Sequence, residues 1–187
     1  MLMNTWRNNR YIAGLITIVR IVLGFQWMSA GWNKITGSES FDAGGYLTHA
    51  ITKPVMDKAT GEAIYPTYNA FIEHLVLPNV KLINIIIPWG EFLVGLGLIL
   101  GALTVTAAFF GIMMNFMFLF AGTVSSNPWL LFLGILVMTA GDNAGRYGAD
   151  RYVLPWLKRN VGVKLIKKKN NGVGSSDSKA RGATDNL

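Results

Sequence analysis

Two charged residues lie inside long apolar segments of this sequence, where they could do chemistry. Arg20 interrupts the run VRIVLGFQWMSAGWNK, and Glu91 interrupts VKLINIIIPWGEFLVGLGLILGAL. A charged side chain at the middle of a bilayer costs about 2.5–3.5 kcal/mol on insertion scales, so it usually pairs or lines a polar cavity. Counted from the start of each segment, the two residues reach similar depths in helices that run in opposite directions. We therefore predict that Arg20 and Glu91 form a buried ion pair or share a polar cavity.

Helical spacing places other glycine, aromatic and polar residues on the same helical face as each of these two charges. Residues three or four apart lie on the same side of a helix. The first stripe is Arg20, Gly24, Trp27, Gly31 and Lys34. The second stripe is Asn84, Pro88, Glu91 and Gly95. Glycines allow a close neighbour, and Trp27 offers a flat wall with an N–H donor.

These stripes predict a pocket for a flat ligand with a polar head. We assign catalytic roles to Arg20 and Glu91. The predicted cofactor-binding residues are Trp27, Lys34, Asn84 and Asn115, the last being the main polar residue of a third apolar segment. The alternative is structural: the two charges would neutralise each other, Trp27 and Asn115 would pack between helices, and Lys34 would extend to the membrane surface.

The composition is that of a membrane protein. Of 187 residues, 51% are hydrophobic and 14% are charged, whereas soluble domains carry about a quarter charged residues. Much of the net charge of +7 follows Arg151, which fits an anchor on anionic lipid better than a nucleic-acid site, and we predict no nucleic-acid binding. The sequence has no cysteine, and His49 and His74 lie far apart in a polar segment, so no metal or haem site is predicted.

The elements that must position these residues are predicted to be all-α. A helix needs roughly 20 apolar residues to span a bilayer. The predicted spans are about 11–33, 80–103, 105–124 and 128–146, which form a polytopic four-transmembrane-helix bundle. The other segments are an N-terminus at 1–10, a long first loop at 34–79 and a basic, partly disordered tail at 152–187.

The distribution of Lys and Arg predicts the orientation. Basic residues gather before the first span and after the fourth, which places both termini in the cytoplasm and the long loop outside it. Within that loop, YNAFIEHLVLP is predicted to form a short amphipathic helix. Asp142 and Arg146, four residues apart, are expected to form a surface pair that caps the fourth helix.

Three motifs in order carry a family resemblance. RIVLGFQWMSAGWNK, EFLVGLGLILG and GDNAGRYGAD resemble the first-helix, second-helix and terminal signatures of DoxX-type membrane proteins. The long first loop is similar to that of the DoxD-like small subunit of thiosulfate:quinone oxidoreductase. The resemblance implies a four-helix protein of the cell membrane that passes electrons from a sulfur compound or a partner oxidoreductase subunit to membrane quinone.

Two other functions stay open at this point. The chain could be a non-enzymatic scaffold that anchors a partner redox protein, or a small-molecule or proton carrier with Arg20 and Glu91 lining its path. Whether the chain is itself an enzyme is left undecided, and so is the formation of a homo-oligomer. If quinone binds, Arg20 would stabilise its reduced anion and Glu91 would relay protons.

Overall fold

The structure, a computed structural model, describes residues 2–160 and is helical throughout its main elements. The helices of the first part of the chain are α1 (Leu2–Asn8), α2 (Arg10–Thr36), α3 (Gly44–Thr52) and α4 (Pro66–Phe71). A π-helix (Ile72–Val76) and a 3₁₀ turn (Leu77–Asn79) lead from α4 into α5 (Val80–Leu100). The remaining helices are α6 (Thr104–Phe120), α7 (Asn127–Thr139) and a 3₁₀ turn at Gly141–Asn143. Over the described residues, extended pairing is limited to one bridge between Met56 and Ala63, so the all-α prediction is confirmed.

Two helices are long and apolar enough to cross a bilayer. They are α2 and the continuous helical stretch Pro66–Leu100, which includes α5. Helices α6 and α7 are also apolar, but they are shorter. Large apolar side chains such as Ile18, Phe25 and Phe109 are at least half exposed on the outer faces of these helices. A water-soluble chain rarely leaves so much apolar surface uncovered.

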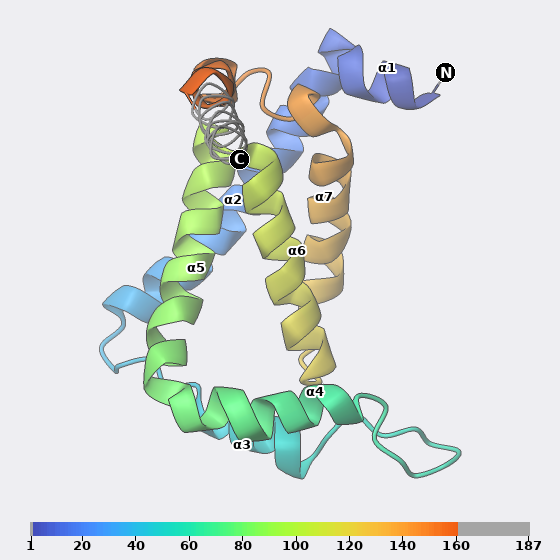
Figure 1. Cartoon of the computed structure of the whole chain (residues 1–187), viewed down its shortest axis with the longest axis vertical. Coiled ribbons are helices and arrows are strands. Elements are labelled where there is room, and N and C mark those ends of the chain that lie inside the picture. The colour runs from blue at the N-terminus through green and yellow to red at the C-terminus, as the bar shows by residue number, and fades with distance from the viewer. Residues whose placement is uncertain (1, 161–187) are drawn as a thin grey trace, which may run out of the picture. The chain divides into compact units, whose positions relative to one another are not determined.

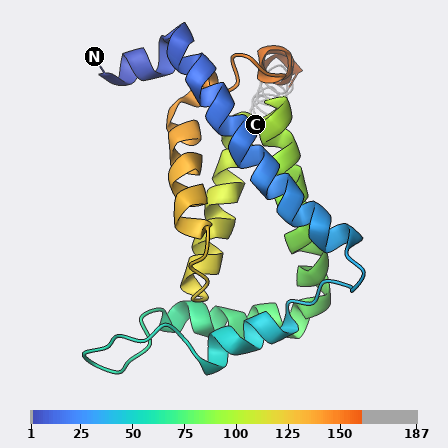
Figure 2. The ribbon, with the colours of Figure 1, turned by 180° about the vertical axis from the view of Figure 1, so that it is seen from behind.

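Helix α2 crosses α5 closely and in the antiparallel sense (Figure 2). A Cβ on Gly24 would lie 2.9 Å from the Gly95 carbonyl oxygen, and one on Gly31 would meet the backbone of Pro88 and Phe92. These positions tolerate only hydrogen because the two backbones touch there. The glycines predicted to permit close approach do so, and they fix the register of the two helices.

Helices α5 and α6 form a hairpin, and α7 lies beside α6 (Figure 1). The hairpin turn begins at Gly101, whose φ of +65° suits a glycine that ends a helix. Ala102 N–H then donates to the Gly97 carbonyl at 2.9 Å. The central core of this bundle contains Ile16, Leu23, Trp27, Val94, Leu98 and Val137 among its buried residues.

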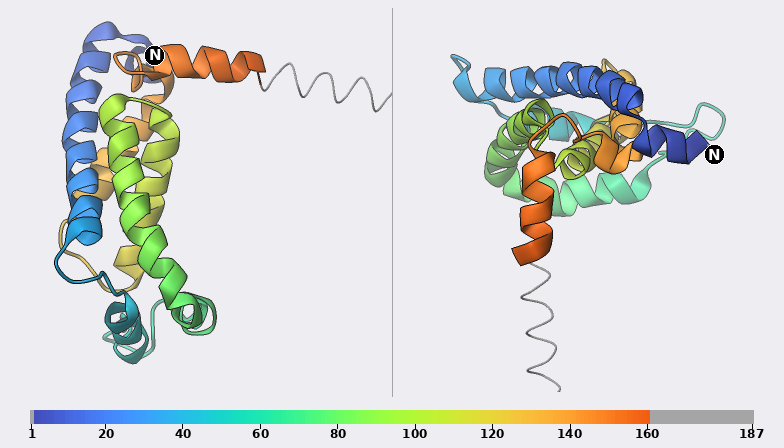
Figure 3. Two further views of the ribbon diagram at one scale, coloured as in Figure 1. Left: turned by 90° about the vertical axis from the view of Figure 1, so that its left-hand side faces the viewer. Right: turned by 90° about the horizontal axis from the view of Figure 1, so that it is seen from above.

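The segment between α2 and α5 folds into its own small layer at one end of the bundle. Helix α3 lies beside the α4–π segment, and the chain bends sharply before it rises as α5 (Figures 1 and 3). The bend falls at Pro78, within the 3₁₀ turn. Leu47, Ala50, Ile72 and Ala121 form the buried core of this layer. The predicted helix at residues 68–78 is thus present, whereas α3, with its GGYLTHAIT sequence, was not predicted.

The other end of the bundle is closed by α1 and the residues that follow α7. Asn143 donates to the carbonyls of Trp6 and Asn9 at 3.0 and 3.1 Å, and Arg146 donates to the Asn8 carbonyl at 3.0 Å. The fourth predicted span extends to residue 146, but α7 ends at Thr139, because Gly141 adopts a φ of +58°. Asp142 and Arg146 therefore do not belong to α7, and a pair between them stays a prediction.

The chain divides into two compact units, residues 1–150 and 151–187. Of the second unit, residues 151–160 are helical. The rest of the predicted basic tail lies outside the described residues.

Candidate functional site

Glu91 is the most deeply buried carboxylate in contact with a cation among the described residues. Its side chain is 3% exposed, and both of its oxygens accept hydrogen bonds from Lys34 Nζ, at 2.6 and 2.5 Å. Lys34 comes from the last turn of α2, and its side chain is 29% exposed. The ammonium also lies 5.5 Å from the ring centre of Phe41, an arrangement that favours a cation.

The predicted ion pair between Arg20 and Glu91 is therefore wrong. Arg20 lies fourteen residues before Lys34 on the same helix, which is about 21 Å along its axis. The prediction counted depth from the ends of the apolar segments. The actual register is set by the glycine contacts between α2 and α5, which place Glu91 near Gly31 and Lys34.

Arg20 lies near the middle of α2, against the turn between α5 and α6. It is 1% exposed, and a Cβ added to Gly101 or Gly148 would collide with its guanidinium group. Asp150 supplies the interacting negative charge. Arg20 Nε and Nη1 are buried and have no hydrogen-bond partner among the described residues.

Asp150 interacts both with the start of α6 and with Arg20. Its two oxygens accept hydrogen bonds from the backbone N–H groups of Leu103 at 2.6 Å and Thr104 at 2.9 Å, at the start of α6. A carboxylate at a helix N-terminus satisfies free donors and opposes the positive end of the helix dipole. The terminal Asp of GDNAGRYGAD thus both caps α6 and balances Arg20.

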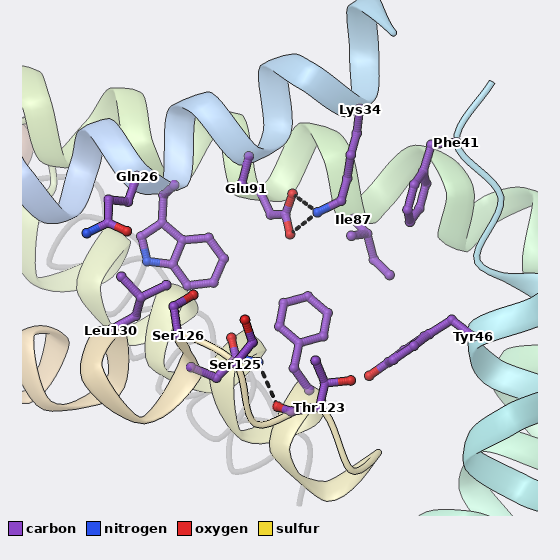
Figure 4. Close-up of a pocket in the computed structure, with 14 residues that line it drawn as sticks. Gln26, Lys34, Phe41, Tyr46, Ile87, Glu91, Thr123, Ser125, Ser126 and Leu130 are labelled. Carbon is purple, nitrogen blue, oxygen red and sulfur yellow. Dashed lines mark hydrogen bonds and ion pairs between the residues drawn. The ribbon is translucent and has the colours of Figure 1, made fainter. Parts of the chain in front are cut away.

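A pocket of about 360 Å³ lies between α2, α5, α6 and α7, with the Lys34–Glu91 pair in its wall (Figure 4). This volume falls in the range of small-molecule sites. The lining residues from the helices are Gln26, Trp27, Ala30, Lys34, Ile87, Glu91, Phe118 and Leu130. The others are Phe41 and Tyr46 from the loop layer, Thr123, Ser125 and Ser126 from the α6–α7 turn, and Asn127 at the start of α7.

The pocket has aromatic walls and a polar floor. Trp27, Phe41 and Phe118 provide flat apolar surface. Across the pocket from the ion pair lies the 123–126 turn, and the Tyr46 hydroxyl points toward it (Figure 4). Gln26, Ser125 and Ser126 are exposed and mark the rim of the pocket.

A second, shallower hollow of about 400 Å³ shares Lys34 and Phe41 with the first. It is lined by Ser40, Lys81 and Asn84, among others. The Lys34 side chain thus lines both hollows. It separates the aromatic pocket from the more polar outer one.

Asn84 uses both of its polar atoms to hold the loop. Its oxygen accepts a hydrogen bond from Ala43 N–H at 2.8 Å, and its amide donates to Asp42 Oδ1 at 3.0 Å. Asn115 is 1% exposed, and neither its oxygen nor its nitrogen has a partner among the described residues. It does not line the aromatic pocket, and contact of Asn84 or Asn115 with a cofactor stays a prediction.

The structure brings together three of the six predicted site residues. Trp27, Lys34 and Glu91 share the aromatic pocket, and Arg20 lies outside its lining. The sequence reasoning missed Phe41 and Tyr46, which lie in the predicted first loop, and the polar residues 123–127, which lie at the junction of two predicted spans. The SSNP sequence marked a chain break but gave no sign of what it faces. Within residues 2–160, no group of three or more potential metal ligands is present.

Comparison with known proteins gives one match. The sequence profile of the DoxX family matches residues 15–124, which include most of α2, the loop layer, α5 and α6. No curated protein and no solved structure shows a significant match to the chain.

Proposed function

Because the chain belongs to the DoxX family, which is membrane-associated, we propose that it is a quinone-binding integral membrane component of an oxidoreductase system. It would span the cell membrane four times through α2, α5, α6 and α7, with both termini in the cytoplasm. The electrons would come from a sulfur compound or a partner redox protein.

The observation that carries this proposal is the aromatic pocket with an ion pair in its wall. Quinones are flat rings with carbonyl acceptors. Stacking against Trp27 and Phe118 would hold such a ring, and the Lys34 ammonium would donate a hydrogen bond to one carbonyl. The pocket's size and its largely apolar lining fit the ring.

The chemistry needed beyond these residues would come from the bound quinone, which carries two electrons and two protons. Glu91 is placed to accept or supply a proton at the pocket wall. Lys34 joins that carboxylate to the outer hollow, which gives protons a short route to the surface. This assigns to Lys34 and Glu91 the roles that the sequence reasoning gave to Arg20 and Glu91.

The test is a titration of the protein in lipid nanodiscs with menadione, a 1,4-naphthoquinone, followed by tryptophan fluorescence. We expect saturable quenching beyond that of nanodiscs without protein. Trp27→Phe should remove most of the saturable signal, and Lys34→Met or Glu91→Gln should weaken binding.

Two matched controls keep this test specific. Lys81→Met removes a lysine that lines only the outer hollow, and Glu73→Gln removes an exposed carboxylate. Both should bind menadione as the native chain does. Quenching no greater than lipid partitioning predicts would overturn the proposal and favour the scaffold function.

A further inference from the structure

Tyr46 reaches the aromatic pocket from outside the main bundle. It lies on α3, and it packs edge-on against Phe118 with ring centres 6.4 Å apart. The buried side chains Leu47 and Ala50 anchor α3 in the loop layer. The Tyr46 ring is therefore held in place, and its hydroxyl enters the pocket.

The hydroxyl of Tyr46 is buried but has no satisfactory partner. It makes no hydrogen bond of acceptable geometry among the described residues. The hydroxyl points toward the Thr123 side chain (Figure 4), and weak hydrogen bonding to that side chain opposes in part the rise in the Tyr46 pKa. Burial is the larger effect and raises that pKa, so the phenol keeps its proton at neutral pH.

A buried donor without a partner costs about 1–3 kcal/mol, so native proteins rarely leave one in place without a reason. The same bundle shows how a tyrosine in this layer is satisfied. Tyr68 donates to the Met117 carbonyl at 2.7 Å. Among the described residues, no backbone carbonyl accepts from Tyr46, and its contact with the Thr123 side chain lacks good hydrogen-bond geometry. Yet Tyr46 lies on the neighbouring helix and faces a cavity.

Given the proposed quinone site, we infer that Tyr46 donates a hydrogen bond to the second carbonyl of the ring, opposite the one bound by Lys34. The two carbonyls of a 1,4-quinone lie on opposite sides of the ring. Lys34 and the Tyr46 hydroxyl likewise approach the pocket from different sides, Lys34 from α2 and Tyr46 from α3 (Figure 4). Tyr46 is thus a specificity-determining residue that selects ligands with two opposed acceptors.

The test compares two ligands of similar shape in nanodiscs. Menadione has two carbonyls, and 2-methylnaphthalene has none. For Tyr46→Phe we expect menadione binding to weaken by three- to tenfold, as for one lost hydrogen bond, with hydrocarbon binding unchanged. The matched control is Tyr68→Phe, which removes a hydroxyl that is already bonded to the backbone and should leave both affinities unchanged.

Equal effects of Tyr46→Phe on the two ligands, or none on menadione, would overturn the inference while leaving the quinone site standing. An absence of saturable menadione binding to the native chain would instead remove the proposed function and the inference with it. A second measurement needs no variant. Infrared spectra of native protein with menadione labelled with ¹³C at one carbonyl or the other should show both stretches lowered by hydrogen bonding, and one unshifted carbonyl would contradict the inference.

Discussion

Lys34 Nζ lies 2.6 and 2.5 Å from the two oxygens of Glu91, and this contact joins the last turn of α2 to the middle of α5. The carboxylate is buried and the lysine is partly exposed. Such a pair places a carboxyl group beside an aromatic pocket and an ammonium group at its edge. It also ties the two helices together beyond their glycine contacts.

Removing one partner of this pair should cost more than removing both. Lys34→Met alone leaves a buried carboxylate unpaired, which costs up to about 3–5 kcal/mol in fully buried sites and less here, because the lysine is partly exposed. We expect a coupling free energy of about 1–3 kcal/mol between Lys34→Met and Glu91→Leu. The measurement is the free energy of unfolding in mixed micelles for both single variants and the double variant.

Arg20→Met provides the control for this cycle. Arg20 and Glu91 contact different elements, so the effects of Arg20→Met and Glu91→Leu should add. Coupling between these two that equals the Lys34–Glu91 coupling would contradict the structure.

The close crossing of α2 and α5 predicts which glycines resist change. Gly31→Ala and Gly95→Ala each place a methyl group against backbone atoms of the other helix, and should lower the free energy of unfolding by about 1–3 kcal/mol. Gly14→Ala, on the same α2, meets nothing within 4 Å and should be neutral or stabilise by up to about 1 kcal/mol. Thermal unfolding of the three variants in one detergent checks the order, and comparable losses at all three positions would refute the packing argument.

Asp150 should be the most sensitive acidic residue at the other end of the bundle. Asp150→Ala removes two hydrogen bonds at the start of α6 and the charge that balances Arg20, so we expect a loss of about 2–5 kcal/mol. Asp150→Asn keeps one of the two acceptor oxygens and removes the negative charge. It therefore measures mainly the effect of losing that charge.

The same Asp150 substitutions made in the Arg20→Met variant separate the loss of the α6 cap from the loss of the charge that balances Arg20. There, Asp150→Asn should cost clearly less than in the native chain, because no buried guanidinium group is left unbalanced. Equal unfolding losses in the two backgrounds would show that Asp150 acts only as a helix cap.

Much of the bundle could be predicted from the sequence, because apolar length and helical spacing are local properties. Trp27, Gly31 and Lys34 were assigned to the inner face of the first helix, and the structure places them there. The partner of Glu91 could not be found in this way. A difference of about four helical turns in register decides between Arg20 and Lys34. That register depends on contacts between two glycine-bearing helices.

The other wall of the pocket could not be predicted from local sequence patterns either, but the cause is different. Phe41 and Tyr46 lie in a loop whose sequence gives no strong periodic signal, and they reach the bundle only because α3 packs under it. The fourth helix was predicted too long because its glycine at position 141 was treated as helical.

The attachment of this loop to α5 should weaken in acid. Asp42 Oδ1 accepts hydrogen bonds from the Asn84 amide and from Gly44 N–H, both at 3.0 Å, and these lower the pKa of Asp42 below its ordinary value of 3.8. A lowered pKa in the folded state stabilises the fold fully above the unfolded-state pKa, and this contribution is lost as the pH falls through the lower folded-state value. Thermal unfolding of the native chain should therefore shift to lower temperature below a pH of about 4. Asp42→Asn should show a smaller shift over the same range, because its amide does not titrate. Identical pH profiles for the two proteins would show that ionisation of Asp42 does not contribute to the stability of the loop layer.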